Sequence, residues 1–373
     1  MYFVCTQTNL IQGLTLVGHV SNKNINLPVL GNVLLKIEAG SLKLSTTNLE
    51  LAVSCLVRGR VEQEGEYSVP TKLFLDYVSL LPSGKVDLIL SEDGLEIKSE
   101  EQETVIKGLS ANEFPLLPKL PSVSPYVIDA QGLRRAISQV VFAVSTSESR
   151  PELMGVACFF GADGVSLVAT DSYRLAERAL VCSGSHATGR YLVPAKACME
   201  IARILGTYKD ELAMPQSVQL SFTDNQMVIN YGNAELVSRL IEGSFPDYQQ
   251  LLPQVFKTET VISRQELQKA VRAASLFSRQ GLFDVTFMFD SEHGNCVIQS
   301  ADQGTGKTKT VVKCAVTGEP NTVVLNHRYV MDGLAAMNSD QVRIKQIDAM
   351  NILLLIPEGS AEKYQYAVMP IRQ

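Results

Sequence analysis

Long apolar runs are absent from this sequence of 373 residues. The longest, ILLLI at 352–356, is far shorter than the roughly 20 residues that a membrane-spanning helix needs. The first ten residues, MYFVCTQTNL, lack the basic segment and apolar stretch of a secretory signal. We therefore expect a cytoplasmic protein with no membrane partner.

Paired metal or disulfide ligands are also scarce. The sequence contains seven cysteines, but no two of them form a Cys-x-x-Cys pair. The four histidines lie far apart and show no ligand spacing either. Scattered cysteines are typical of reduced thiols in a reducing compartment. We expect no metal site, no disulfide framework and no cofactor.

A complete phosphate-binding loop is missing, although ADQGTGKTKT at 301–310 resembles the end of one. The pattern G-x-x-x-x-G-K-[ST] requires glycine where this chain has Ala301, because the loop must turn tightly to direct N–H groups at phosphates. It also needs a following helix, whereas TVVKCAV at 310–316 predicts a strand. A nucleotide-binding enzyme built on 301–308 is therefore kept only as an alternative, beside a generic repeat scaffold for protein contacts. No set of nucleophile, base and orienting residue stands out, so we expect no enzyme.

The composition is that of an ordinary globular protein, with 46% hydrophobic and 19% charged residues. A chain of this length exceeds the size at which one hydrophobic core keeps growing, so we expect two or three domains. The net charge of −6 excludes a uniformly basic surface for nucleic acid, but it allows a local basic face.

A threefold internal repeat is the most informative feature of the sequence. Three segments place apolar residues at i, i+4 and i+7, which predicts an amphipathic helix in each. These first helices are expected at 9–21, 131–145 and 265–279, and a second helix recurs at 67–82, 191–206 and 323–338. Two of the second helices open with Val-Pro, and proline is well placed in a first helical turn.

Alternating β-branched segments with Gly, Asn and Asp at the turns lie between these helices and predict strands. GLSANEFPLLP at 108–118 is similar to IEGSFPDYQQLLP at 241–253, in register with the helices. The sequence therefore predicts an α+β protein of three similar domains, with boundaries at 1–122, 123–254 and 255–373.

The same alignment bears on the near phosphate-binding loop. STTNLELAV, VATDSYRLA and QSADQGTGKTK occupy the same predicted hairpin in the three repeats. Lys307 and Lys309 are thus expected where a turn leads into a strand, and no helix N-terminus is available there to hold an anion.

ATDSYRLAERA, SFPDYQQLLP and the terminal YAVMPIRQ resemble the bacterial β sliding clamps, the processivity factors of DNA polymerase III. The resemblance covers the whole chain. It implies a non-enzymatic, head-to-tail homodimeric ring of three DNA-clamp domains per chain, with sheets outside and helices lining a hole around double-stranded DNA. It also implies binding, without sequence specificity, to DNA, and binding of the DNA polymerase III catalytic subunit, the clamp loader, other polymerases and repair proteins through short linear peptides.

Charge is consistent with such a lining. Residues 131–144 carry +2, residues 194–209 carry +2 and residues 264–280 carry +3, whereas the other three helices are neutral. Solvated helix faces are the alternative explanation. The candidate DNA-binding residues are Arg134, Arg135, Lys196, Arg203, Lys72, Lys269 and Arg272.

The resemblance also implies a peptide-binding groove between the second and third domains. Its residues would be Leu153, Thr170, Ser172, Tyr173, Arg174, Leu175, Pro246, Leu251, Asn326, Tyr329, Met350, Val368, Met369, Pro370, Ile371 and Arg372. Apolar and aromatic walls with a few polar groups suit a peptide anchor. The commonest family pattern, TDGHRL, is replaced here by TDSYRL, and the chain ends in Gln373, so peptide preference is expected to differ.

The subunit interface is expected at the open sheet edges of the first and third domains. Opposite charges would meet there, with Glu101 and Glu103 facing Lys307 and Lys309, and apolar groups would supply most of the adhesion. The apolar candidates are Leu276 and Phe277 against Phe74, Tyr77 and Ile106.

Overall fold

The structure, a computed structural model, describes residues 1–21, 27–38, 40–117, 124–184, 188–207 and 215–372. Its six α-helices within these ranges agree with the two helices predicted for each repeat. They are α1 (Gln7–Val17), α2 (Thr71–Leu80), α3 (Ala130–Val140), α4 (Ala195–Leu205), α5 (Arg264–Ser275) and α6 (His327–Ala335). The predicted apolar stripes of α1, α3 and α5 are buried throughout.

The helix ends differ from the predicted ones by a few residues. Helix α1 begins earlier than expected because Thr6 is its N-cap, with the side-chain oxygen accepting a hydrogen bond from the Asn9 amide. It ends at Val17, with Gly18 as its C-cap, before the polar residues that the sequence prediction included. Helix α4 ends at Leu205. Lys209, which entered the predicted helix charge, lies outside the described residues.

Contacts divide the chain into two compact units, 1–131 with 183–185 and 200–240, and 132–182 with 186–199 and 241–373. Both units contain part of the middle repeat. The reason is strand pairing: β18 (Ala234–Arg239) pairs with β4 (Leu51–Val57) in the first unit, and β13 (Arg174–Leu180) pairs with β27 (Tyr364–Val368) in the second. Each seam between repeats is therefore a continuous sheet.

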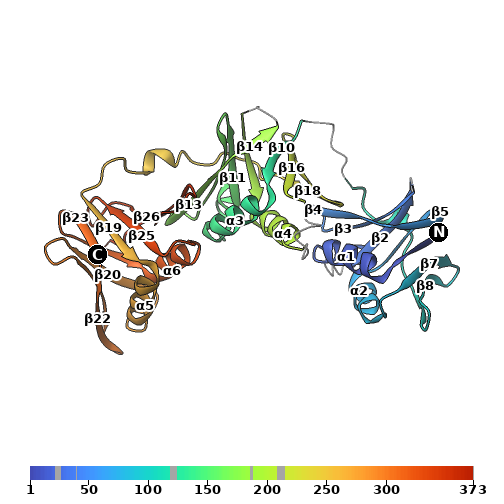
Figure 1. The fold of residues 1–373 in the computed structure, drawn as a ribbon, viewed down its shortest axis with the longest axis horizontal. Coiled ribbons are helices and arrows are strands. Elements are labelled where there is room, and N and C mark those ends of the chain that lie inside the picture. Colours follow the sequence, from blue (N-terminus) through green and yellow to red (C-terminus); the bar gives the residue numbers. More distant parts are fainter. Residues whose placement is uncertain (22–26, 39, 118–123, 185–187, 208–214, 373) are drawn as a thin grey trace. The chain divides into compact units, whose positions relative to one another are not determined.

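The first unit contains a five-stranded sheet, β5-β1-β7-β8-β9, and a nine-stranded sheet, β14-β10-β16-β17-β18-β4-β3-β2-β6. Helices α1 and α2 pack on each other, and α1 also covers β3 and β4 (Figure 1). The strands not yet bounded are β1 (Tyr2–Thr6), β2 (Asn32–Glu38), β3 (Ser41–Thr47), β5 (Gly59–Gln63), β6 (Gly65–Pro70), β7 (Lys85–Ser91), β8 (Gly94–Lys98), β9 (Glu103–Ile106), β10 (Tyr126–Asp129), β14 (Cys182–Gly184), β16 (Ser217–Phe222) and β17 (Gln226–Tyr231).

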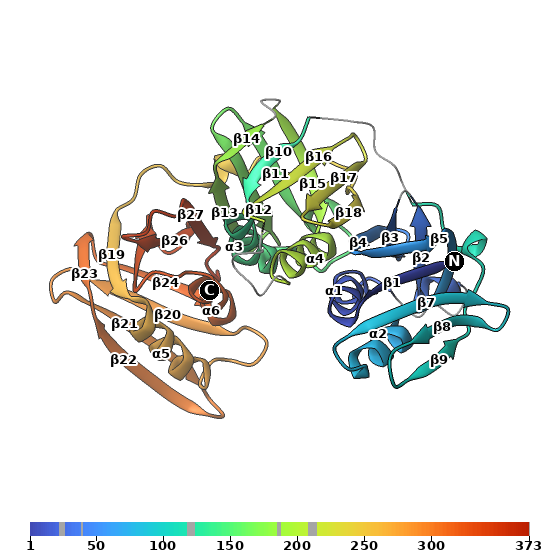
Figure 2. The same ribbon diagram turned by 45° about the vertical axis from the view of Figure 1, so that its right-hand side comes forward.

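The second unit contains a nine-stranded sheet, β15-β11-β12-β13-β27-β26-β25-β19-β23, and a four-stranded sheet, β22-β21-β20-β24. Helices α5 and α6 pack together, and α5 also lies on β20–β22 (Figure 2). The strands not yet bounded are β11 (Gly155–Gly161), β12 (Gly164–Thr170), β15 (Gly189–Pro194), β19 (Thr258–Ser263), β20 (Asp284–Asp290), β21 (Asn295–Asp302), β22 (Gly306–Lys313), β23 (Ala315–Gly318), β24 (Asn321–Asn326), β25 (Gln341–Gln346) and β26 (Leu353–Glu358).

Two turns repeat the same hydrogen bonds in the first and second repeats. The Thr47 hydroxyl donates to the carbonyl four residues on, at 3.0 Å, and accepts from the Leu49 amide at 3.1 Å. The Thr170 hydroxyl likewise donates to the carbonyl four residues on, at 2.6 Å, and accepts from the Ser172 amide at 3.1 Å. The predicted alignment of these two hairpins is therefore confirmed at the level of individual hydrogen bonds.

The ends of β18 and β27 also form corresponding backbone hydrogen bonds in the two seams. At the last residue of β18, the Arg239 amide donates to the Glu50 carbonyl at 3.0 Å, and just after β27 the Met369 amide donates to the Tyr173 carbonyl at 2.8 Å. In both seams, the exit from one repeat is thus tied to the turn of the preceding repeat.

Candidate functional site

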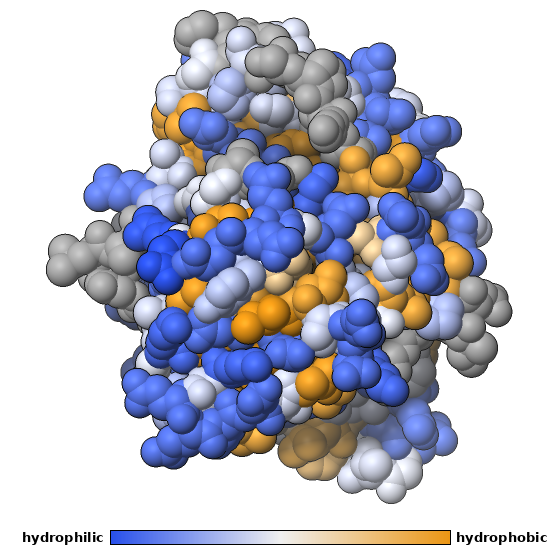
Figure 3. All heavy atoms as spheres, turned by 90° about the vertical axis from the view of Figure 1, so that its right-hand side faces the viewer, coloured by the Kyte–Doolittle hydropathy of each residue, from blue (hydrophilic) through white to orange (hydrophobic). Residues whose placement is uncertain are grey.

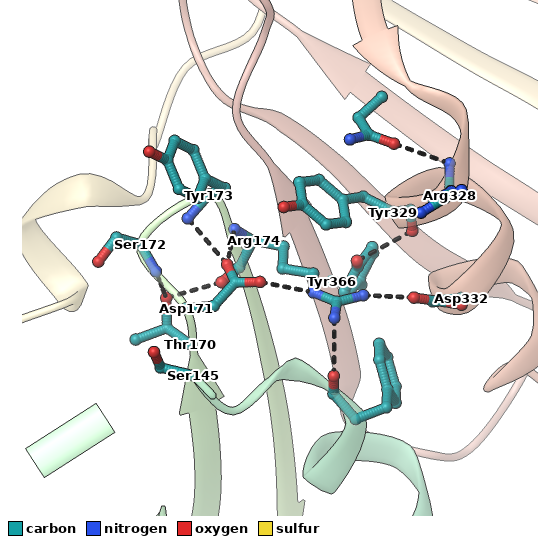
Figure 4. A network of polar contacts seen from close by, with 12 residues as sticks. Ser145, Thr170, Asp171, Ser172, Tyr173, Arg174, Arg328, Tyr329, Asp332 and Tyr366 are labelled. Carbon is teal, nitrogen blue, oxygen red and sulfur yellow. Dashed lines mark hydrogen bonds and ion pairs between the residues drawn. The ribbon is translucent and has the colours of Figure 1, made fainter. Parts of the chain in front are cut away.

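The turn between β12 and β13 is the centre of the candidate groove (Figure 4). One oxygen of Asp171 accepts from the amides of Tyr173 and Arg174, at 2.9 and 3.0 Å, which is a typical aspartate-stabilised turn. Ser172 has φ 79°, in the left-handed region that glycine occupies most readily. The turn therefore presents Tyr173 outward, with 63% of its surface exposed.

Arg174 is held by acceptors on every side. Its guanidinium donates to Asp171 at 2.9 Å, to the Phe142 carbonyl at 2.8 Å and to Asp332 of α6. Its carbon centre also lies 4.6 Å from the ring centroid of Tyr329, within the range of a cation–π interaction. Arg174 thus joins the middle repeat to α6.

The neighbouring phenol, Tyr366, completes this network. Its hydroxyl donates to the Tyr329 carbonyl at 2.9 Å. Burial raises the pKa of Tyr366 above its ordinary value, more than the nearby Arg174 charge lowers it, so the phenol remains a neutral donor. Burial alone lowers the pKa of Arg174, but interactions with Tyr366, Asp332 and Asp171 outweigh it and raise that pKa.

The C-terminal segment lies along the same site. Besides the Met369 bond to Tyr173, the Ile371 amide donates to the Val324 carbonyl of β24 at 2.8 Å. These two bonds tie residues 369–371 to both repeats. The backbone of this segment is therefore held at two points, and the side chain of Met369 is exposed.

The predicted groove residues fall into three groups. Tyr173, Leu251, Met350, Met369 and Arg372 are exposed, and Ser172 is exposed on the turn. Arg174, Pro246, Asn326, Tyr329, Pro370 and Ile371 are half-buried. A correction concerns Leu153, Leu175 and Val368, which are buried core residues, as Thr170 is. Buried side chains of this kind offer little surface to a peptide.

Three contributors escaped the sequence prediction. Phe142 and Asp332 fix Arg174, but they lie on other elements and carry no local signal. Arg150 donates to the Ser172 hydroxyl at 3.0 Å and pairs with Glu152 at 3.1 Å. The sequence signal that could have identified Arg150 is its position as a basic residue directly before the Pro151–Leu153 turn.

The predicted DNA-binding cations differ in availability. Arg134, Lys196, Lys269 and Arg272 are exposed and form no ion pair with any residue that the structure describes. Lys72 pairs with Asp76 at 2.7 Å, and Arg135 lies 3.6 Å from Glu362.

Arg203 is a correction. Its guanidinium donates to the buried Glu200 carboxylate at 2.6 Å and to the Thr15 carbonyl at 3.1 Å. It therefore caps the C-terminal end of α1, where an arginine is favourable because the helix dipole is negative there. A residue committed in this way is a structural element of the first unit and not a free cation.

The helix charges shrink accordingly. Within the observed bounds, α3 and α5 each carry +2 and α4 carries +1, whereas α1, α2 and α6 are neutral. Arg279, which entered the predicted sum, lies beyond α5 and pairs with Asp284. The positive sign of the helices remains.

Both predicted interface strands are sheet edges, since β9 and β22 each pair on one side only among the described strands. Glu103 and Val105 are exposed on β9, as Lys309 and Val311 are on β22. Glu101 lies in the turn before β9 and not on the strand, and Glu103 also pairs with Lys98 of its own chain at 2.9 Å. Lys307 and Lys309 line a hollow of about 970 Å³ together with Thr286 and Gln299.

The apolar part of the interface prediction needs correction. Phe74 is 0% exposed, and Ile106 is buried as well, so neither can contact another subunit. Leu73 and Leu80 of α2 are exposed instead, as Val105 of β9 is. Tyr77 and Phe277 are half-buried, and Leu276 is exposed. Figure 3, which views the molecule from the side on which β7 and β8 are drawn in Figure 1, shows apolar patches among polar side chains.

Residues 301–308 form a hairpin and not a phosphate-binding loop. Strand β21 ends at Asp302 and β22 begins at Gly306. The Asp302 carboxylate accepts from the Gly304 amide at 2.9 Å and from the Thr305 amide at 3.1 Å. The turn N–H groups are therefore already bonded to an acid, which disfavours a phosphate.

The sequence also makes predictions about metal ligands, membrane helices and cysteines. The described residues contain no cluster of three potential metal ligands and no helix long and apolar enough to cross a membrane. All seven cysteines are free, and burial raises the pKa of Cys55 and of Cys158 to about 12. Such thiols are poor nucleophiles.

Comparison with known proteins covers the whole chain. Three family models match this chain. They describe the N-terminal, central and C-terminal domains of the DNA polymerase III beta subunit, and they match residues 1–118, 127–247 and 249–372. A Beta sliding clamp from Synechocystis is 30% identical over 100% of this chain and 99% of its own length. One from Synechococcus elongatus is 30% identical, with the same coverage.

Solved structures agree with this match. The DNA polymerase III subunit beta from Pseudomonas aeruginosa superposes with a TM-score of 0.93 at 27% identity, covering 100% of both chains. The sliding clamp from Bacillus subtilis, at 24% identity, shares the fold with a TM-score of 0.92. This chain therefore belongs to the family of bacterial DNA polymerase III beta subunits, the β sliding clamps.

Proposed function

We propose that this protein is a DNA sliding clamp. Two copies join head to tail in a ring around double-stranded DNA, and the ring tethers the replicative polymerase so that it remains on its template. The observation that carries the proposal is the match of all three family domains, in order, over the whole chain. Phosphate contacts position a protein without reading sequence, which suits a ring that must slide.

The helices would face the DNA. Their net charge is positive in a chain with a net charge of −6, so the duplex would meet the most basic part of an acidic protein. The exposed cations Arg134, Lys196, Lys269 and Arg272 are the proposed phosphate contacts. Lys72 and Arg135 could join them only by exchanging their present carboxylate partners. The chain would act without catalysis of its own.

The groove around Tyr173 would hold short peptides of the polymerase catalytic subunit, the clamp loader, other polymerases and repair proteins. The exposed side chains of Tyr173, Leu251, Met350 and Met369 would form its walls, and Arg174 would supply a fixed polar group, which is the arrangement of a peptide anchor. Exposed methionines at 350 and 369 suit a surface that accepts several partners. Tyr173 and Ser172 are the positions at which peptide preference would differ from relatives.

The ring would close where β9 of one copy meets β22 of the other. Lys307 and Lys309 would face the acidic residues 101 and 103, and exposed pairs of this kind contribute about 0.2–1 kcal/mol each. Leu276, Leu73 and Leu80 would supply most of the adhesion, because they are exposed in this chain and apolar. A sheet edge that pairs in the ring is also protected from aggregation.

Retention on DNA tests the proposal. The chain is loaded on a nicked circular plasmid, and the bound fraction is measured before and after the circle is linearised. A clamp is retained on the circle and lost from linear DNA, whereas a generic scaffold shows no difference. Titration calorimetry with ATP addresses the alternative, because a nucleotide-binding enzyme would release measurable heat.

A further inference from the structure

A hydrogen-bonded bridge lies behind the groove, between the seam strands and the segment 241–256. The Glu177 side chain on β13 accepts from the Tyr248 hydroxyl at 2.8 Å and from the Gln365 side chain at 2.6 Å. Glu177 and Gln365 are direct partners across the β13–β27 pair. One carboxylate thus joins both seam strands to a third segment.

Tyr248 is the anchor of that segment. It is buried, and its ring lies 5.8 Å from that of Phe159 and 6.3 Å from that of Phe245. It belongs to an apolar cluster with Leu175 on the strand that carries Glu177. A buried phenol needs a hydrogen-bond partner, and Glu177 provides it.

Two predicted wall residues of the groove depend on Tyr248. Pro246 precedes it by two positions, and Leu251 follows in a short 3-10 helix, Gln249–Leu251, whose N-cap is Tyr248. The Leu251 amide donates to the Tyr248 carbonyl at 3.0 Å. Leu251 is nevertheless 63% exposed, so its own packing does little to hold it in place.

We propose that Glu177 is a positioning residue for peptide binding, which holds the wall formed by Pro246 and Leu251 against the seam through Tyr248 without touching the peptide. This proposal rests on the groove function proposed above. A wall fixed before binding costs less ordering entropy when a peptide arrives.

The test uses the full-length chain and a fluorescent peptide copied from a DNA polymerase III catalytic subunit, with affinity measured by anisotropy. Glu177→Ala is expected to bind about ten-fold more weakly, because a hydrogen bond to a buried phenol is lost. Glu177→Gln keeps an acceptor for Tyr248 and should remain within about three-fold of the parent. Glu358→Ala is the matched control, because that carboxylate also joins two strands of the same sheet, through Arg343.

Hydrogen exchange supplies a second readout. The Leu251 and Leu252 amides, both bonded within the 3-10 turn, should exchange faster in Glu177→Ala, whereas the β13 amides should not. Affinity within two-fold of the parent, or weaker binding with unchanged exchange at these two amides, would overturn the proposal. If the parent chain itself fails to bind the peptide, the groove function is wrong, and exchange at Leu251 still decides whether Glu177 holds the segment.

Discussion

Leu49 and Ser172 have the same left-handed backbone conformation, with φ 77° and 79°, at the same turn of two successive repeats. Neither residue is glycine, and a leucine in this region is strained. Both turns nevertheless keep the same threonine hydrogen bonds, so the repeat preserves the backbone path even where the side chain does not favour it. Such strain often accompanies functional turns, and the Ser172 turn belongs to the proposed groove.

The strain at Leu49 can be measured by comparison with a second leucine. Leu49→Gly should leave the free energy of unfolding unchanged or raise it by about 1 kcal/mol, because glycine adopts positive φ without cost. Leu56 is equally exposed, 47% against 49%, but lies in β4 without positive φ. Leu56→Gly should therefore lower the unfolding free energy by about 1–2 kcal/mol. Urea denaturation of both variants checks this, and equal losses would contradict a strained Leu49.

Arg174 should not tolerate replacement by lysine. An ammonium group cannot reach Asp171, Asp332 and the Phe142 carbonyl together, since these acceptors match the planar fork of a guanidinium. Arg174→Lys should lower the unfolding free energy of the unit that contains it by about 2–3 kcal/mol. Arg372→Lys, an exposed change, should stay within about 0.5 kcal/mol. A thermal melt in which the two variants coincide would contradict the network.

Truncation after Val368 should abolish peptide binding while the chain remains a dimer. The lost residues include Met369 and Ile371, whose backbone bonds tie the tail to Tyr173 and Val324. Peptide affinity is measured by anisotropy and subunit mass by sedimentation. If the truncated chain retains its peptide affinity, the tail does not form part of the groove. If the truncated chain is a monomer, the tail contributes to the ring interface instead.

DNA contact through the helices should be weak and steeply dependent on salt. Replacing Arg134 and Arg135 with alanine should reduce the slope of log K against log salt by up to about 2, because each phosphate contact contributes about 0.9. Arg203→Ala is the control: it should destabilise the protein, because α1 loses its cap, but leave the slope unchanged. Binding is measured on short duplexes by anisotropy at several salt concentrations, and a slope change with Arg203→Ala alone would reverse the assignment.

Charge reversal at the proposed ring junction should be rescued by its complement. Lys307→Glu with Lys309→Glu should weaken each junction of the dimer about two- to thirty-fold at low salt, because two exposed pairs of about 0.2–1 kcal/mol each are lost there. Adding Glu101→Lys and Glu103→Lys should restore it. Leu276→Ala and Phe277→Ala should weaken the dimer more than either charge change. Analytical ultracentrifugation decides, and the absence of rescue would make the two lysines ordinary solvated residues of a hairpin.

Much of the fold follows from the sequence alone. The buried stripes of α1, α3 and α5 and the hairpin at 301–310 are local patterns, since a helix repeats every 3.6 residues and a strand every two. The threefold repeat then predicts that corresponding segments adopt the same path, as the turns at 47–51 and 170–174 do.

Only the tertiary structure decided which side chains remain available. Periodicity places Phe74 and Ile106 on a face of their own elements, but it cannot tell whether another element covers that face, and here both are buried. Arg203 has the spacing of a free lining cation, yet its guanidinium bonds to Glu200 on its own helix. It also bonds to Thr15 at the end of α1, almost 190 residues away in the sequence. Arg174 and Glu177 depend in the same way on partners far away in the sequence, Asp332 for the first and Tyr248 and Gln365 for the second. Sequence determines local conformation through short-range geometry, whereas the burial and pairing of a polar group depend on contacts that only the folded chain brings together.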